Sequence, residues 1–131
     1  MILVDTSVWI DFLHGKNSIY RHALHNLIEK EEDVCISGII LTEILQGIRD
    51  DEIFSEIKRY LLEFPIYNPK DVDTYIFASN IFRQCKKKGK TVRKTVDCLI
   101  AAIAIENGLI LLHNDRDFDS IKQCADLKVV V

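Results

Sequence analysis

The chain lacks the long apolar segment that a membrane-spanning helix requires. No hydrophobic run approaches the ~18 consecutive apolar residues of such a helix. The apolar start, Met1–Val4, has no basic segment before it and is too short for a secretory signal. We therefore expect no membrane association, and the absence of an export signal favours the cytoplasm.

Cysteine and histidine are few and scattered. The four cysteines (Cys35, Cys85, Cys98 and Cys124) form no C-x-x-C pair, and no histidine stands at zinc-finger spacing from them. Three of the cysteines have apolar neighbours, which is typical of buried, inert thiols. The sequence therefore argues against a zinc site.

The chain has no excess of positive charge, no internal repeat and no low-complexity linker. Its 131 residues are 48% hydrophobic and 28% charged, which predicts a single globular domain spanning residues 1–131. The net charge of −3 does not favour binding to a polyanion. One basic segment nevertheless allows such binding, and it contains Lys86, Lys87, Lys88, Lys90, Arg93 and Lys94.

Two short apolar runs, Met1–Val4 and Leu109–Leu112, are each followed by an acid. Runs of this kind are typical of parallel strands that are covered on both faces. Ligands of parallel sheets bind outside the carboxyl ends of the strands. We therefore expect Asp5 and Asp115 to meet at one edge of the sheet.

Helical segments alternate with the expected strands, which predicts an α/β sandwich with a central, mostly parallel sheet of about four or five strands. Thr95 is the expected N-cap of the helix that carries Asp97, and Ser37 of an earlier one. The expected helices are 8–13, 18–29, 38–48, 50–64, 71–87, 96–106 and 118–124, and the other strands are 33–37, 66–67 and 128–131.

Glu43 and Asp97 are acids within apolar helical segments. Asp97 belongs to a segment that is apolar on every side, so we expect it to be buried. An unpaired buried carboxylate costs several kcal/mol or takes up a proton. The first-turn position of Asp97 offsets only about 0.3–1 kcal/mol. Each acid alone also has a simpler explanation, Asp97 as a first-turn Asp and Glu43 as a partner of Arg49 or of a lysine, but the pair favours a cation nearby.

Together, the four acids Asp5, Glu43, Asp97 and Asp115 predict a site for a hard divalent cation, Mg²⁺ or Mn²⁺. Asp5, Asp97 and Asp115 are the expected metal ligands, and one or two ions are compatible with the pattern. Such a site suits phosphodiester hydrolysis, with Asp97 or Asp115 orienting the attacking water. The expected supporting residues are Thr6, Ser7, Asn114 and, as a possible fifth acid, Asp117.

Four segments resemble the acidic motifs of PIN-domain ribonucleases, and their spacing resembles the VapC toxins of type II toxin–antitoxin modules. They are Asp5–Ile10 (DTSVWI), Thr42–Gly47 (TEILQG), Thr95–Ala101 (TVDCLIA) and Leu112–Phe118 (LHNDRDF). The match covers essentially the whole chain and is specific only as a set. Asn114 departs from the pattern, because many relatives carry Thr or Ser there.

This resemblance implies a single PIN domain of the α/β/α sandwich type and Mg²⁺- or Mn²⁺-dependent endonucleolytic cleavage of RNA. It implies that Asp5, Glu43, Asp97 and Asp115 carry the reaction, and it makes RNA the expected partner of the basic segment. It further implies a homodimer and a cognate VapB-like antitoxin, whose C-terminal segment lies by the helices between Gly38 and Phe64. Transfer RNA, ribosomal RNA and messenger RNA are all compatible substrates.

Three other functions remain open at this point. A haloacid-dehalogenase phosphatase also begins with a strand and an Asp, but it requires a second Asp where this chain has Ser7. A phospho-receiver module requires a phosphoacceptor Asp after a middle strand and a late Lys, and neither is evident. A PIN domain that binds RNA without cutting it is disfavoured because all four acids are present.

Overall fold

Residues 1–130 are described by a computed structural model, in which five parallel strands form one sheet in the order β3-β2-β1-β4-β5. This confirms the expected α/β sandwich with a mostly parallel sheet. The strands are β1 (Ile2–Val4), β2 (Val34–Ser37), β3 (Ile66–Tyr67), β4 (Ile110–Leu112) and β5 (Lys128–Val129). The helices are α1 (Thr6–Leu13), α2 (Ile19–Glu29), α3 (Gly38–Gln46), α4 (Asp51–Leu61), α5 (Val72–Lys87), α6 (Thr95–Glu106) and α7 (Arg116–Lys122).

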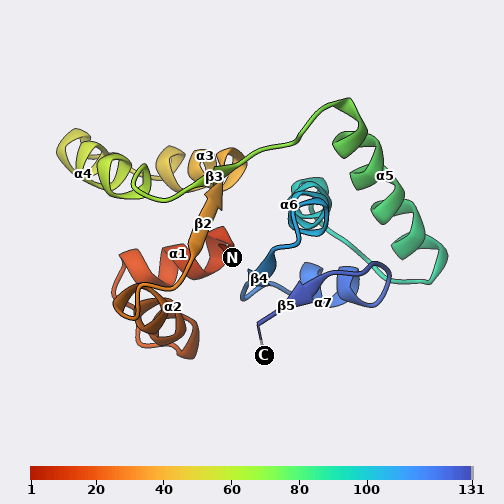
Figure 1. Ribbon diagram of the computed structural model, residues 1–131, viewed down its shortest axis with the longest axis horizontal. Helices are drawn as coiled ribbons and strands as arrows, with labels where there is room; N and C mark the ends of the chain where they lie inside the picture. The colour runs from red at the N-terminus through yellow and green to blue at the C-terminus, as the bar shows by residue number, and fades with distance from the viewer. Residues whose placement is uncertain (131) are drawn as a thin grey trace.

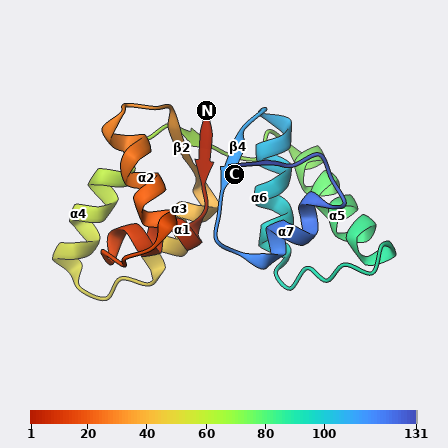
Figure 2. The same ribbon diagram turned by 90° about the horizontal axis from the view of Figure 1, so that it is seen from below.

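The helices form two groups with the strands between them. Helices α1 to α4 lie on one side and α5 to α7 on the other, as Figures 1 and 2 show from two directions. The core between them contains the completely buried Trp9, Phe118, Leu3 and Leu111. Trp9 packs edge-on against Phe64, with ring centroids 5.3 Å apart, and so joins α1 to the end of α4. Trp9 and Phe118 are therefore core aromatics.

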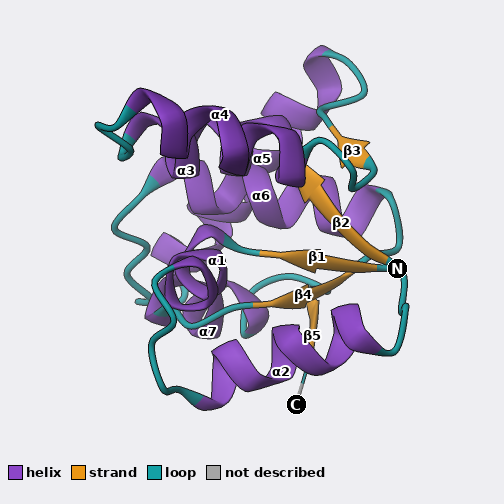
Figure 3. Cartoon of the chain, turned by 90° about the vertical axis from the view of Figure 1, so that its left-hand side faces the viewer, coloured by secondary structure: helices purple, strands orange, loops and turns teal. Residues whose placement is uncertain are grey.

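The two central strands place the site. In β1, Val4 pairs with Leu112 of β4, and the Asp5 N–H donates to the Leu112 carbonyl at 2.9 Å. These strands lie side by side in Figure 3 and point the same way. Strand β2 pairs with the outer side of β1, and β5 pairs with the outer side of β4. The chain therefore builds the sheet outwards in opposite directions from the boundary between β1 and β4. Ligands of open α/β sheets bind outside the carboxyl ends of strands at such a switch point.

Several expected helix boundaries are wrong, and α1 begins at Thr6 and not at residue 8. Lys94, and not Thr95, is the N-cap of α6, and its side chain makes no capping hydrogen bond. Helix α7 begins at Arg116 and not at residue 118, because the Asp115 carboxylate accepts from the Asp117 N–H and caps the helix. Helix α4 ends at Leu61, before the expected break at Pro65. The predicted last strand, 128–131, extends beyond the described residues at position 131.

The cysteines are free thiols, as expected. All four are unpaired, and Cys35, Cys85 and Cys98 are buried. Burial raises the pKa of both the Cys35 and Cys85 thiols to about 12, which keeps them protonated and unreactive at neutral pH. Among residues 1–130, no helix combines the length and the apolar character needed to cross a membrane.

Candidate active site

Asp5 stands where β1 ends and α1 begins. Its Oδ2 accepts hydrogen bonds from the Ser7 backbone N–H at 3.1 Å and from Ser7 Oγ at 2.6 Å. Ser7 Oγ also accepts from the Asn114 backbone N–H at 2.9 Å, which ties the loops after β1 and β4 together. Burial raises the pKa of Asp5, the Ser7 hydrogen bonds oppose the rise, and the charge of Asp115 adds to it. Ser7 thus orients Asp5, whereas Asn114 contributes its backbone.

Asp115 reaches the same place from the end of β4. Its Oδ1 accepts from the Asp117 N–H at 2.9 Å and from the Arg93 guanidinium at 3.3 Å, and its Oδ2 accepts from Lys94 Nζ at 2.5 Å. Burial acts to raise the pKa of Asp115, but the hydrogen bonds from Lys94 and Asp117 hold it below its usual value. Asp115 is therefore ionised at neutral pH.

Asp97 lies in the first turn of α6 and is buried, as its apolar surroundings predict. Burial raises the pKa of Asp97 to about 8, and a hydrogen bond shared with Asp117 favours the protonated form. Lys94 Nζ lies 3.4 Å from Asp97 Oδ2 without the geometry of a hydrogen bond, so this buried oxygen has no hydrogen-bond partner among residues 1–130. The nearest cation to Asp97, the Lys94 ammonium, is shared with Asp115 and so does not fully neutralise an ionised Asp97.

Asp117 is the most firmly held of the acids. It is buried, and it accepts from the backbone N–H groups of Arg93 (3.1 Å) and Lys94 (3.0 Å) and from Arg93 Nε (3.1 Å). Burial acts to raise its pKa, but these bonds and the one shared with Asp97 hold it below the usual value. Asp117 fixes the segment that leads into α6 and hence the position of Asp97.

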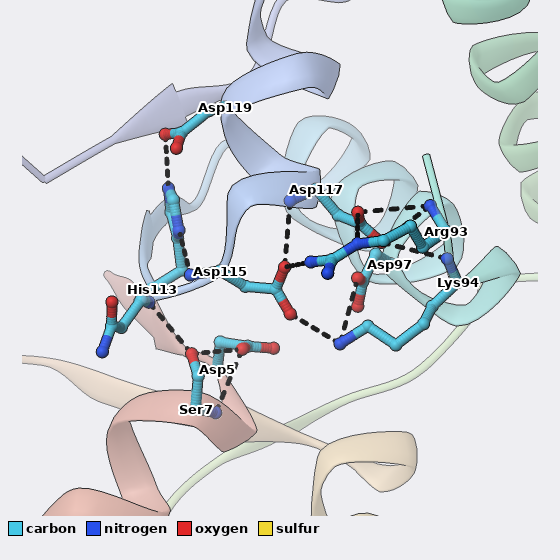
Figure 4. A network of polar contacts seen from close by, with 10 residues as sticks. Asp5, Ser7, Arg93, Lys94, Asp97, His113, Asp115, Asp117 and Asp119 are labelled. Atoms are coloured by element: carbon cyan, nitrogen blue, oxygen red, sulfur yellow. Dashed lines mark hydrogen bonds and ion pairs between the residues drawn. The ribbon is translucent and has the colours of Figure 1, made fainter. Parts of the chain in front are cut away.

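The structure brings four acids together, and Asp117 is one of them. Figure 4 shows Asp5, Asp97, Asp115 and Asp117 in one group, with the Lys94 ammonium between Asp97 and Asp115 and with Arg93 beside Asp117. Oxygens of Asp97, Asp115 and Asp117 lie within 4.8 Å of one another, a spacing that allows one cation to bind all three. Asp5 faces the group from β1 but is not one of these three.

Glu43 lies at the margin of this group. It is half-buried on α3, and its Oε1 accepts from Thr6 Oγ1 at 2.8 Å. Thr6 follows Asp5 directly, so Glu43 is connected to the acids through the start of α1. The expected meeting of four acids therefore holds only indirectly for Glu43, which contacts Thr6 and is not one of the clustered acids.

The predicted basic segment divides into two parts. Arg93 and Lys94 turn towards the acids: Arg93 Nε pairs with Asp117 at 3.1 Å, and Lys94 pairs with both Asp97 and Asp115. The remaining four lysines are exposed at the end of α5 and in the loop that follows, and they are Lys86, Lys87, Lys88 and Lys90. All six side chains are exposed, but only the four lysines of the second part make no ion pair with the acids, as the sequence analysis assumed for the whole segment.

His113 supports the site although the sequence analysis did not identify it. Its Nδ1 lies 3.1 Å from the Asp115 backbone N–H, which fixes Nδ1 as the acceptor. Its ring packs against Phe118 with centroids 5.1 Å apart, and burial lowers the pKa of His113. A neutral His113 therefore helps to hold the loop that presents Asp115. The sequence feature that could have identified His113 is its position between the expected strand Leu109–Leu112 and Asp115.

The residues present fit a hard divalent cation. The donors are carboxylate oxygens, which Mg²⁺ and Mn²⁺ prefer, and Asp97 Oδ2 is a buried oxygen that lacks a hydrogen-bond partner among residues 1–130. A cationic group, the Lys94 ammonium, already lies between Asp97 and Asp115. The site therefore attracts positive charge.

Comparisons with known proteins agree with this geometry. The family model described as PIN domain matches residues 2–123. Ribonuclease VapC11 of Mycobacterium tuberculosis is 35% identical over 129 residues, covering 98% of this chain and 96% of that protein. A toxin-antitoxin complex from Klebsiella pneumoniae contains a chain with a TM-score of 0.74 and 25% identity, covering 100% of this chain and 97% of that one. VapBC2 from Rickettsia felis, bound to a DNA fragment from its promoter, has the same fold, with a TM-score of 0.76, 21% identity and coverage of 99% and 98%.

Proposed function

Because this chain belongs to the PIN-domain family, and within it to the VapC ribonucleases, we propose that it is a metal-dependent endoribonuclease, the toxin of a VapBC-type toxin–antitoxin module. The observation that carries this proposal is the meeting of Asp97, Asp115 and Asp117 within 4.8 Å beside Asp5. The phosphatase and phospho-receiver alternatives have no comparable support.

In the proposed mechanism the acids bind divalent metal. Asp5, Asp97 and Asp115 would hold Mg²⁺ or Mn²⁺, which when bound would polarise a phosphoryl oxygen and lower the pKa of a water molecule. Asp97 or Asp115 orients the attacking water. Ser7 fixes the Asp5 carboxylate, and Thr6 fixes Glu43 at the margin. Asp117 holds the segment before α6 in place through its hydrogen bonds to Arg93 and Lys94.

Removal of divalent metal tests the activity directly. We expect the wild-type protein to cut a labelled single-stranded RNA internally with Mg²⁺ or Mn²⁺, and to stop cutting when EDTA is added. The measurement is gel separation of the RNA products, with excess metal restoring cleavage as the control. Full cleavage in EDTA would contradict the proposal, and binding without cleavage in any metal would favour the non-cutting PIN-domain alternative.

Lys94 is expected to compete with the metal, because its ammonium group occupies the space between Asp97 and Asp115. Lys94→Met keeps the chain length and removes the charge. The half-exposed ion pairs contribute about 1 kcal/mol, so Mn²⁺ affinity should rise about fivefold. The measurement is calorimetric Mn²⁺ titration without RNA, and Lys90→Met is the matched control from the same loop. Unchanged or weaker Mn²⁺ binding by Lys94→Met would show that the ammonium does not occupy the metal position.

The antitoxin part of the proposal is supported by an apolar hollow between α1, α3 and α4. Its volume is about 390 Å³, and its apolar lining includes Ile10, Leu13, Ile44, Ile53 and Ile57. It lies beside the helices between Gly38 and Phe64, where the resemblance places the antitoxin segment. An apolar side chain of such a segment would fill it.

The homodimer belongs to the same proposal. One face of α5 exposes Val72, Tyr75 and Ile76, each more than half accessible, while Ala78 and Ile81 face the core. Exposed apolar side chains gathered on one helix face are typical of a protein–protein interface. This face supports self-association through α5.

A further inference from the structure

A hollow of about 350 Å³ opens beside the acids, and Asp115 is part of its wall. Tyr20 from the first turn of α2 lines it, together with His113 and with Arg116 and Asp119 from α7. A volume in this range is typical of small-ligand sites. A molecule bound in this hollow would therefore touch both Asp115 and residues outside the four acidic motifs.

Two guanidinium groups extend the hollow towards the basic loop. Arg93 and Arg116 line this hollow and also a second one of about 310 Å³, which Lys90 and Thr91 border. The two hollows therefore adjoin at the arginines. Together they run from Tyr20, past Asp115, to the loop after α5, and their walls carry acids as well as the two arginines.

Arg116 supplies the cation for an anionic ligand. The Arg93 guanidinium is engaged by Asp115 and Asp117, whereas Arg116 makes no ion pair with any of residues 1–130. Arg116 is exposed and is the first residue of α7, directly after Asp115. A phosphate held by Arg116 would lie next to the acids.

Tyr20 supplies an aromatic ring to the wall of the hollow. Its side chain is partly buried against the core, and its hydroxyl makes no hydrogen bond within residues 1–130. Single-stranded RNA is bound by aromatic rings on which bases stack and by cations that hold its phosphates. The hollow combines both features beside the proposed site of cleavage.

We propose that this hollow is a nucleotide-binding subsite for single-stranded RNA, in which Arg116 binds a phosphate next to the cleaved one and Tyr20 stacks on a base. The inference rests on the proposed function for its choice of RNA. His113, fixed by the Asp115 backbone and by Phe118, is a rigid part of the wall of the subsite.

The test is binding of a fluorescein-labelled single-stranded RNA decamer, followed by anisotropy in EDTA over a series of KCl concentrations. Arg116→Ala should reduce the slope of log affinity against log salt by about 0.7, the loss of one phosphate contact. Tyr20→Leu should weaken binding about 5- to 150-fold with the slope unchanged. Tyr20→Phe keeps the ring and should bind like the wild type.

Arg59→Ala is the matched control, because Arg59 is exposed on α4. It should change neither the salt slope nor the affinity for RNA. Thermal unfolding of each variant separates loss of binding from loss of fold, because Tyr20 also packs against the core. An Arg116→Ala slope equal to that of Arg59→Ala would overturn the subsite, as would equal binding by Tyr20→Leu and Tyr20→Phe or no RNA binding by the wild type. Absence of metal-dependent cleavage with the expected binding pattern would instead overturn the nuclease proposal and leave the subsite standing.

Discussion

Asp97→Asn is expected to lower kcat/KM for RNA cleavage by about 10³-fold or more while the protein stays folded. The carboxylate is proposed to hold the metal, and metal stabilisation of the transition state contributes several kcal/mol. Asn is nearly isosteric, so the packing of α6 around this buried position should persist. The measurement is cleavage of labelled RNA in saturating Mg²⁺ or Mn²⁺.

The same substitution should stabilise the metal-free protein at neutral and alkaline pH. The pKa of Asp97 is about 8 in the folded protein and near 3.8 when unfolded, so the folded state binds the proton more tightly. The stability from this proton is fully present below pH 3.8 and is lost as the pH rises towards 8. In EDTA, the wild-type Tm should therefore fall over this window relative to that of Asp97→Asn.

Asp126→Asn provides a control for the charge change, because Asp126 is exposed and does not belong to the group of acids. It should preserve both cleavage and the wild-type dependence of Tm on pH. Cleavage at the wild-type rate by Asp97→Asn would refute the role of this carboxylate. A Tm difference that does not vary with pH would show that Asp97 is ionised in the metal-free fold.

The order of strands and helices was predictable because local patterns determine it. Continuous apolar runs identified β1 and β4, and Ser37 was the expected cap of α3. Helix α4 was expected from residue 50, which is its N-cap in the structure. Helix α5 was also expected, but its spacing could not show which face is buried. Thr74, Ala78, Ile81 and Cys85 face the core, while the larger Tyr75 and Ile76 are exposed.

The acids were predictable as a set because each follows a strand or interrupts an apolar helix. The contacts among them were not, since they depend on packing between distant segments. Lys94 and Arg93 belong to a run of basic residues that resembles a solvated helix end, yet they turn towards Asp115 and Asp117. No local pattern indicates that Asp117 accepts a hydrogen bond from the backbone N–H of Arg93, 24 residues before it.

Asp117→Ala is expected to destabilise the protein by about 3–5 kcal/mol, the usual cost of removing one partner from a buried charged network. The carboxylate accepts from the backbone N–H groups of Arg93 and Lys94 and from Arg93 Nε, and Ala replaces none of these bonds. At about 3–5 °C per kcal/mol for a chain of this length, the Tm should fall by roughly 9–25 °C. Because the pKa of Asp117 is lowered in the folded state, its contribution is present above the unfolded value of 3.8 and is lost as the pH falls through the folded value.

The Arg93→Ala variant separates the two kinds of bond that Asp117 accepts. It removes the largely exposed guanidinium but keeps both backbone bonds to Asp117, so its effect on Tm should be clearly smaller. Equal destabilisation by Arg93→Ala and Asp117→Ala would mean that the side-chain ion pair, and not the backbone contact, holds this segment. If the backbone contact dominates, Asp117→Ala should also weaken Mn²⁺ binding, because the segment it releases leads directly into Asp97.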